Sequence, residues 1–398
     1  MGGVNMAGLE FSAPYNGDPE TLEEILKLKR LGKNRIREIY LSGPEEYAGS
    51  GRVMPETDFD AFTDVVDKIH KEGIRVNLVF NSTCGGTEWY SPEGVKSTME
   101  FIRQMHEEHG VEEVTIANPL FIMEVNRRIP AITIGASVLC DIDSVQKALI
   151  YRKAGAKVIT PDVNINRDLK LLKEIKEATN LELKLMVNEG CLHKCPFRKF
   201  HFNDTSHQAK EVRELAMSTP YTAGFFDACN QVMHEDHSQI LKSGWIRPED
   251  TKKYSEITSF FKIVGRSQGM SKVIRTTKAY LEESWYGDLI DILCASSGRF
   301  TSRFGSYLNN QSLEKYKFFE TITSCDNNCR QCNYCEELAG RLIKLGVLTR
   351  EKLEDDGRTD VADKLGKAGR LPLIPSFNLI KDQGRGLKGE VPFQTRFK

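Results

Sequence analysis

The stretch LKLMVNEGCLHKCPFR, residues 183–198, joins a short apolar run to a turn that carries two cysteines. Leu183–Val187 has the length and apolar character of a buried strand. Cys191 and Cys195 lie in the turn, and Cys195 precedes a proline, as the last cysteine of ferredoxin-type cluster motifs does. We therefore expect a strand whose end carries a candidate metal centre.

On both sides of this stretch, strand-like runs alternate with amphipathic helical patterns about eight times, which predicts a parallel sheet. A TIM barrel needs about 250 residues, and the expected strands spread from near residue 9 to near residue 266. Several expected helices end at a glycine stop. The expected strands are 9–13, 38–41, 75–80, 113–117, 131–135, 157–160, 183–187 and 260–264, and the helices include 19–31, 58–71, 92–109, 142–154 and 167–178.

An open, doubly wound sheet is the structural alternative. Against it, no G-x-G-x-x-G motif follows the first expected strand, where Pro14–Gly17 stands instead. We therefore predict an α/β fold, a TIM-type (β/α)8 barrel over residues 1–270 with an insertion at about 191–259. Residues 271–398 are expected to form a C-terminal helical iron–sulfur appendage with an extended tail, and 272–294 and 336–348 are its clearest helical patterns.

The bulk composition is that of an ordinary globular protein. Among 398 residues, 40% are hydrophobic and 28% are charged, and the net charge of -1 argues against a chain built mainly to coat nucleic acid. The sequence shows no signal-peptide pattern and no apolar run long enough to span a membrane, so we expect a cytoplasmic protein. In that reducing compartment, ten cysteines are expected to be ligands rather than disulfides.

The most specific motif is a late run of four cysteines spaced C-x3-C-x2-C-x2-C. Thiolates select zinc or iron–sulfur, and a tightly spaced single run is more typical of a [4Fe–4S] cluster than of zinc. Its first three cysteines also match the radical SAM motif, but here the motif follows the barrel and a fourth ligand is present, which disfavours that assignment. The four residues are Cys325, Cys329, Cys332 and Cys335.

The carboxyl ends of the expected strands are rich in polar and thiol side chains, as is usual for the active-site end of a barrel. Cys191 and Cys195 need two further thiols to hold a cubane, and Cys229 and Cys84 lie in segments expected at the same end. Cys140 is the reserve ligand, whereas Cys294 lies in an apolar helical pattern and is expected to be a buried small hydrophobe. Asn16, Ser42 and Asn118 also follow strands, and capping or turn roles explain them equally well.

Three motifs together resemble the collagenase-like peptidase family, peptidase family U32. They are the Asn-Glu-Gly-Cys turn after a strand, the following Cys-Pro, and IRPED at 246–250 leading into FKIVGR at 261–266. The resemblance covers roughly residues 9–266. It implies a barrel-mouth [4Fe–4S] cluster held by Cys84, Cys191, Cys195 and Cys229. The commoner family pattern has His-Gly where this chain has Glu189-Gly190, and the late cluster is absent from the simplest members.

The family is named for proteolysis, but the resemblance also implies oxygen-independent hydroxylation of RNA bases or ubiquinone precursors by iron–sulfur members. We therefore expect a redox enzyme with two [4Fe–4S] clusters, acting on a small molecule or RNA base and supplied by a possible electron-donor protein. Arginine suits carboxylate or phosphate binding, and histidine suits proton transfer near neutral pH. The expected pocket residues are Glu189, His193, Arg198, His201, His207 and Arg266.

Two other function classes stay open. A peptidase needs a hydrolytic metal or an activated nucleophile, and the chain contains neither H-E-x-x-H nor G-x-S-x-G, although Glu189 is able to activate a water. A nonenzymatic iron–sulfur carrier or RNA-binding protein is suggested by the basic and aromatic segment 194–200, which a solvated loop face explains more simply.

Overall fold

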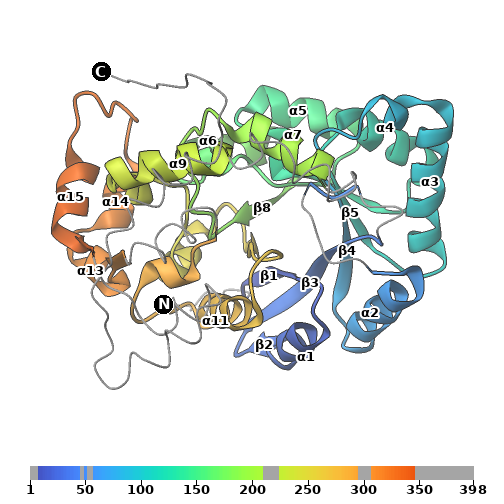
Figure 1. Cartoon of the computed structure of the whole chain (residues 1–398), viewed down its shortest axis with the longest axis horizontal. Helices are drawn as coiled ribbons and strands as arrows, with labels where there is room; N and C mark the ends of the chain where they lie inside the picture. Colours follow the sequence, from blue (N-terminus) through green and yellow to red (C-terminus); the bar gives the residue numbers. More distant parts are fainter. Residues whose placement is uncertain (1–7, 45–48, 52–56, 209–223, 295–305, 346–398) are drawn as a thin grey trace, which may run out of the picture.

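The computed structural model describes residues 8–44, 49–51, 57–208, 224–294 and 306–345, and in this part eight parallel strands close into a barrel (Figure 1). The barrel closes because β1 pairs with both β3 and β9. The predicted α/β TIM-type fold is therefore confirmed. The barrel strands are β1 (Glu10–Pro14), β3 (Asn34–Ser42), β4 (Arg75–Phe80), β5 (Glu113–Ile116), β6 (Thr133–Ala136), β7 (Val158–Ile159), β8 (Glu182–Met186) and β9 (Phe260–Lys262).

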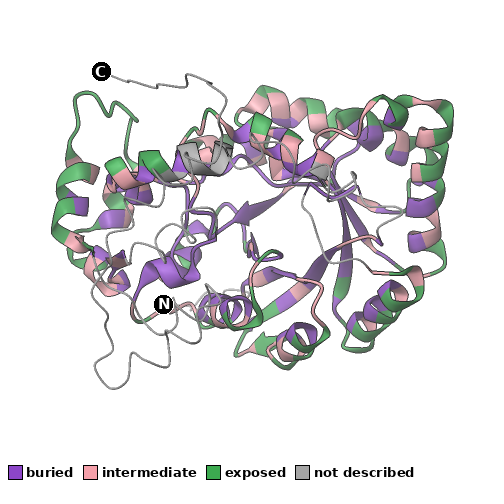
Figure 2. Cartoon of the chain, viewed as in Figure 1, coloured by how far each residue is buried: buried purple, intermediate pink, exposed green. Residues whose placement is uncertain are grey.

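Helices between the strands form the outer layer, and each buries one face against the barrel (Figure 2). Asp18, Asp58 and Asn118 begin three of them by accepting hydrogen bonds from backbone N–H groups of the first turn, so the capping interpretation of Asn118 is confirmed. These helices are α1 (Pro19–Lys27), α2 (Phe59–Lys71), α3 (Pro92–Glu107), α4 (Pro119–Arg128), α5 (Val145–Ala154), α6 (Leu169–Thr179) and α11 (Met270–Leu281).

Three expected helices end earlier than predicted. The segment 19–31 stops at Lys27, and β2 (Arg30–Leu31) then pairs antiparallel with β3. The segment 272–294 stops at Leu281, because Glu283 and Gly287 adopt left-handed backbone conformations that no helix continues through. The segment 336–348 yields α15 (Tyr334–Leu342) and then β11 (Ile343–Lys344), which pairs with β10 (Tyr307–Leu308).

The expected insertion lies between β8 and β9, and the C-terminal helices pack beside it. Trp245 of the insertion stacks on Phe318 with ring centroids 5.2 Å apart, so the two regions share one core. In Figure 1 the C-terminal helices lie on the opposite side of the barrel from α2, α3 and α4. These elements are α7 (Arg198–Gln208), α9 (Gly224–Glu235), α10 (Ser238–Lys242), α13 (Asn310–Lys315), α14 (Phe318–Thr323) and α15.

Short 3-10 helices complete the chain that the structure describes. One of them begins at Pro248, in the segment IRPED, and proline is well tolerated in a first helical turn because its missing N–H is not needed there. The tail expected from about residue 369 lies outside the described residues. The 3-10 segments are η2 (Thr87–Tyr90), η3 (Val138–Cys140), η4 (Val163–Ile165), η5 (Pro248–Tyr254) and η6 (Leu289–Ile292).

The barrel interior contains a layer of buried charge. Lys184 Nζ lies 2.6 Å from Glu38 Oε1 and 2.7 Å from Glu113 Oε1. Asn77 Nδ2 donates to both carboxylates, and Ser12 Oγ donates to Glu38. Each of these groups points inward from its own strand, so the network joins five strands across the barrel.

In the described part of the chain, no helix combines the length and the apolar character that crossing a membrane requires.

Candidate functional site at the barrel mouth

The turn after β8 is fixed to the next strand and to η6 by Asn188. Its Nδ2 donates to the carbonyl oxygens of Val264 and Ile292, and its Oδ1 accepts from the Val264 N–H at 2.7 Å. The backbone of Cys294 then pairs with this turn, donating to the Asn188 carbonyl and accepting from the Gly190 N–H, both at 2.7 Å. Asn188 is 1% exposed, so the sequence directly ahead of Cys191 is locked into the mouth of the barrel.

A buried ion pair lies next to this turn. Arg198 Nη1, at the start of α7, is 2.7 Å from Glu189 Oε1, and both residues are buried. Burial alone lowers the pKa of Arg198, but the Glu189 carboxylate and the Cys191 thiol more than reverse that effect. Arg198 Nε and Nη2 are buried and have no hydrogen-bond partner among the described residues. Asp141 Oδ1 lies 3.9 Å from Nε, beyond hydrogen-bond distance, so both donors are available for a further negatively charged group.

Two of the four thiols expected to serve as mouth ligands, Cys195 and Cys229, lie in one small packed cluster, and Cys191 is close enough to Cys195 for the two to interact electrostatically. Cys229, from α9, is buried with Leu192 and Met233, and Cys195 packs against this small cluster. Burial raises the pKa of Cys191 well above its usual value, and the Glu189 carboxylate raises it further, while Arg198 acts in the opposite direction. Burial also raises the pKa of Cys195. Both thiols therefore remain protonated at neutral pH unless a cation or cluster binds them.

The other cysteines lie in different surroundings. Cys84 follows β4 in a loop whose Thr83 N–H donates to Ser206 Oγ of α7, which attaches that loop to the insertion. Cys140 is buried, and its thiol donates to the Ala117 carbonyl at 3.3 Å. Burial raises the pKa of Cys140 to about 12, which suits a packed small side chain. Cys294 is buried as expected but lies beside the Asn188–Cys191 turn rather than in a helix.

The remaining predicted pocket residues are spread over three elements. Burial, then the charges of Lys194 and Arg167, lower the pKa of His193 to about 4, so its ring is neutral at pH 7. His201 stacks on Phe202 within α7, and His207 lies in the last turn of that helix. Arg266 Nη1 donates to Ser42 Oγ at 2.5 Å, which gives Ser42 a role other than helix capping.

Cys325, Cys329 and Cys332 lie between α14 and α15, Cys335 lies in the first turn of α15, and the group is much more exposed than the mouth thiols. Cys325, Cys329 and Cys332 are exposed, and Cys335 is half-buried against the core. The Asn327 N–H donates to Cys325 Sγ at 3.3 Å, with Asn327 in a left-handed conformation. Such a backbone N–H to sulfur bond suits a thiolate ligand. Two nearby cations also act on these thiols. Arg167, just after η4, interacts electrostatically with Cys325 and Cys335, and Lys242 of α10 interacts with Cys329.

The donor chemistry of both cysteine groups fits a thiolate-bound ion or cluster. Among the residues that the structure describes, however, no three Cys, His, Asp or Glu side chains are grouped closely enough to hold a metal ion. The ligand assignments therefore stay predictions. Binding at either place requires the side chains to draw closer together.

Comparison with known proteins gives one family match, which covers much of the barrel and reaches the turn after β8. Residues 23–194 match peptidase family U32, a match that extends into the Cys191–Cys195 turn. An uncharacterized protease of Methanocaldococcus jannaschii is 32% identical over 343 residues, covering 84% of this chain and 99% of the relative. The chain belongs to peptidase family U32. A solved U32 peptidase shares the fold, with a TM-score of 0.50 and 20% identity over 67% of this chain and 96% of that one.

Within this U32 barrel, one buried residue beneath the mouth, Lys262, was not predicted from the sequence. Lys262 of β9 is 8% exposed, its Nζ lies 3.8 Å from the centroid of the Tyr40 ring, and no described carboxylate pairs with it. Burial, then the charges of Lys184 and Arg266, lower its pKa to about 7. A lysine in the middle of the apolar run FFKIV was the available signal, because alternate residues of a barrel strand point inward.

Proposed function

We propose that this U32 protein is an iron–sulfur redox enzyme whose mouth thiols hold a [4Fe–4S] cluster beside the substrate. The observations that support the proposal are the packing of Cys195 against Cys229 and the position of Cys191 beside Glu189 and the buried Arg198, whose Nε and Nη2 make no hydrogen bond within the described residues. Cys84 is the proposed fourth ligand. The cluster supplies one-electron chemistry when bound, and the substrate class is a small molecule or RNA base.

The protein's own residues have distinct proposed roles at this site. Arg198 orients an anionic group, because its Nε and Nη2 need acceptors and its charge is already fixed by Glu189. His193 acts as a neutral hydrogen-bonding group rather than as an acid, since its pKa of about 4 leaves it uncharged at pH 7. Arg266 is proposed to position substrate, because its guanidinium is held in place by hydrogen bonds to the hydroxyls of Ser42 and Ser50.

The late cysteines are proposed to hold a second [4Fe–4S] cluster that passes electrons, with zinc as the less favoured occupant. Their exposure suits contact with an electron-donor protein. The backbone N–H donated to Cys325 Sγ supports a thiolate at that position.

Peptidase activity is the second candidate function, and the comparisons favour it by name. The family is called a peptidase family, and the relative at 32% identity is called a protease. The site chemistry supports hydrolysis less well. Raised thiol pKa values make Cys191 and Cys195 weak nucleophiles, and Glu189 is already paired with Arg198.

Metal analysis after anaerobic purification separates the two functions. We expect about eight irons and eight acid-labile sulfides per chain, falling by about four of each in Cys229→Ser and, independently, in Cys332→Ser. Cys84→Ala and Cys140→Ala identify the fourth mouth ligand, since only one of them should lose the mouth cluster. Zinc without sulfide, together with hydrolysis of a peptide substrate, would establish the peptidase and reject the redox proposal.

A further inference from the structure

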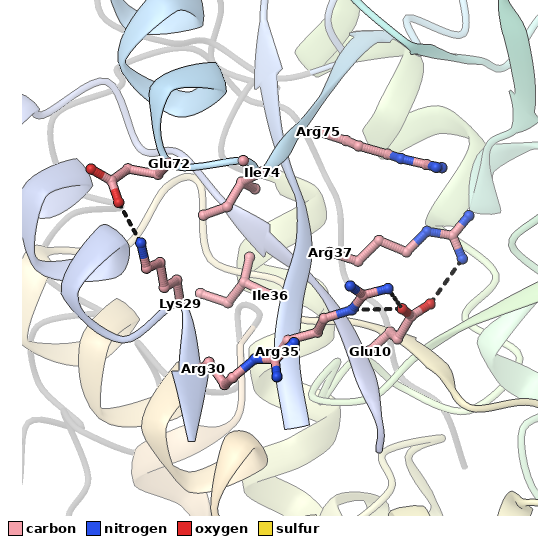
Figure 3. A pocket seen from close by; sticks show the side chains of 10 residues that line it. Glu10, Lys29, Arg30, Arg35, Ile36, Arg37, Glu72, Ile74 and Arg75 are labelled. Atoms are coloured by element: carbon pink, nitrogen blue, oxygen red, sulfur yellow. Dashed lines mark hydrogen bonds and ion pairs between the residues drawn. The ribbon is translucent and has the colours of Figure 1, made fainter. Parts of the chain in front are cut away.

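A cavity lies at the N-terminal end of the barrel strands, the end opposite the mouth. It has a volume of about 520 Å³, which is within the usual range for small-molecule sites. Residues of β1, β2, β3 and the start of β4 line it, and Ile36 and Ile74 are its buried apolar residues (Figure 3). The mouth residues discussed above take no part in it.

The lining carries an excess of positive charge. Five of its residues are cationic and two, Glu10 and Glu72, are anionic. Lys29 Nζ is 2.6 Å from Glu72 Oε2, so that pair is neutral overall. Glu10 is shared by two arginines, because it binds Arg35 and also lies 3.2 Å from Arg37 Nη1. The cationic residues are Lys29, Arg30, Arg35, Arg37 and Arg75.

Strand register brings the arginines together. Arg30 lies directly opposite Arg35 in the antiparallel β2–β3 pair, so two like charges face each other on one side of the sheet. Arg75 is paired with Glu38 in the β3–β4 register, which places it beside Arg37 on the neighbouring strand. Like charges in facing positions are destabilising, and of these arginines only Arg35 and Arg37 have a carboxylate among the described residues to offset the repulsion.

Arg30 and Arg75 are the two arginines with no carboxylate partner among the described residues, and both are exposed. Arg37, by contrast, is held rigidly by Glu182 through Nη1 at 2.5 Å and Nη2 at 2.9 Å and stacks on Phe260 at 4.3 Å. The cavity therefore combines fixed guanidinium groups with two that have unused donors. Guanidinium forks match the oxygens of phosphate in bidentate geometry.

We propose that this cavity binds a phosphate-bearing small molecule, with Arg30 and Arg75 as direct contacts and Arg35 and Arg37 as fixed walls. The volume admits a ligand of nucleotide size rather than a single phosphate. The site is separate from the proposed chemistry at the mouth, and it stands whether that chemistry is redox or hydrolytic.

Calorimetric titration of the full-length chain with pyrophosphate tests the site, with citrate as a carboxylate probe. Arg30→Ala and Arg75→Ala should each weaken pyrophosphate binding about tenfold or more, because each removes charge-assisted hydrogen bonds. Glu72→Gln should tighten it, since it removes one of the two negative charges in the lining. Lys33→Ala is the matched control, an exposed cation of the same β2–β3 turn that does not line the cavity.

Several outcomes would overturn the proposal. They are no pyrophosphate binding at millimolar concentration, equal weakening in Lys33→Ala, or citrate binding as tightly as pyrophosphate. The last result would show a site that responds to charge alone. Circular dichroism of each variant confirms the fold, and the exposure of Arg30 and Arg75 predicts that it is retained.

Discussion

The barrel and the C-terminal helical region both carry charges and clustered cysteines, but they place them in opposite environments. In the barrel, Lys184 is enclosed with two carboxylates, and Cys229 is 7% exposed. In the C-terminal region, Arg341 pairs with Glu337 at 3.7 Å on an open helix surface, and Cys332 is exposed. The same chemical groups therefore contribute very differently to stability in the two regions.

The difference also concerns how each cysteine group is positioned. The mouth thiols are held by packing and by a turn fixed through Asn188, so the protein alone positions them. The described segment 325–335 contains no buried residue, so a bound ion or cluster would itself supply much of the order there.

Lys184→Ala should give the largest loss of stability. The substitution leaves the Glu38 and Glu113 carboxylates buried without their cation, which costs about 3–5 kcal/mol. Arg341→Ala, the C-terminal control, should change stability by less than about 0.5 kcal/mol because its ion pair is exposed. Chemical denaturation of both variants measures the contrast, and a loss below about 1 kcal/mol in Lys184→Ala would contradict it.

Lys262→Met should stabilise the barrel at pH 7, by an amount on the order of a few kcal/mol. Burial, with the charges of Lys184 and Arg266, lowers the pKa of Lys262 from 10.5 to about 7, while Glu38 and Glu113 act in the opposite direction. Between pH 7 and 10.5 the unfolded chain holds a proton that the folded chain lacks. The natural protein therefore gains stability as pH rises through this window.

The variant lacks that pH-dependent gain, so its advantage over the natural protein should shrink as pH rises from 7 to 10. Denaturation midpoints at several pH values measure this. Lys278→Met, an exposed lysine of α11, is the control and should show a pH profile parallel to that of the natural protein. A constant difference between Lys262→Met and the natural protein across this range would show that Lys262 is charged in the fold.

The barrel was predictable because each strand coincides with a local apolar run and the helices that follow are marked by a capping residue or a glycine stop. The Cys191–Cys195 turn was predictable for the same local reason. The Glu38–Lys184 contact was not, because the two residues are 146 positions apart and meet only when the barrel closes. Cys294 was wrongly predicted to lie in a helix because the apolar pattern continues past Glu283. The helix itself stops before this residue, whose backbone is left-handed.

Cys229→Ser should cost about 1–2 kcal/mol in the metal-free, reduced protein, because the hydroxyl replaces a thiol that packs with Leu192 and Met233. Cys332→Ser should cost less than about 0.5 kcal/mol, since that side chain is exposed. Thermal unfolding in the presence of a chelator measures both. Equal losses would mean that the C-terminal segment is as well packed as the mouth.

Alkylation rates compare the mouth cysteines with the C-terminal cysteines by their reactivity instead of by protein stability. In the metal-free protein, iodoacetamide should modify Cys325, Cys329 and Cys332 first, because these thiols are exposed. Cys191 and Cys195 are partly buried and should react at least about tenfold more slowly at pH 7.5, mainly because desolvation raises their pKa and the thiolate is the reacting form.

The same experiment distinguishes the two causes of slow reaction. Raising the pH from 7.5 to 9 increases the thiolate fraction of a high-pKa thiol by more than tenfold, so Cys191 should accelerate strongly if its pKa limits the rate. If access alone limits it, the rate should change little until the protein unfolds. Mass spectrometry of tryptic peptides resolves each cysteine, and modification of Cys191 as fast as Cys329 at pH 7.5 would show that the mouth is open to solvent and not a buried thiol site.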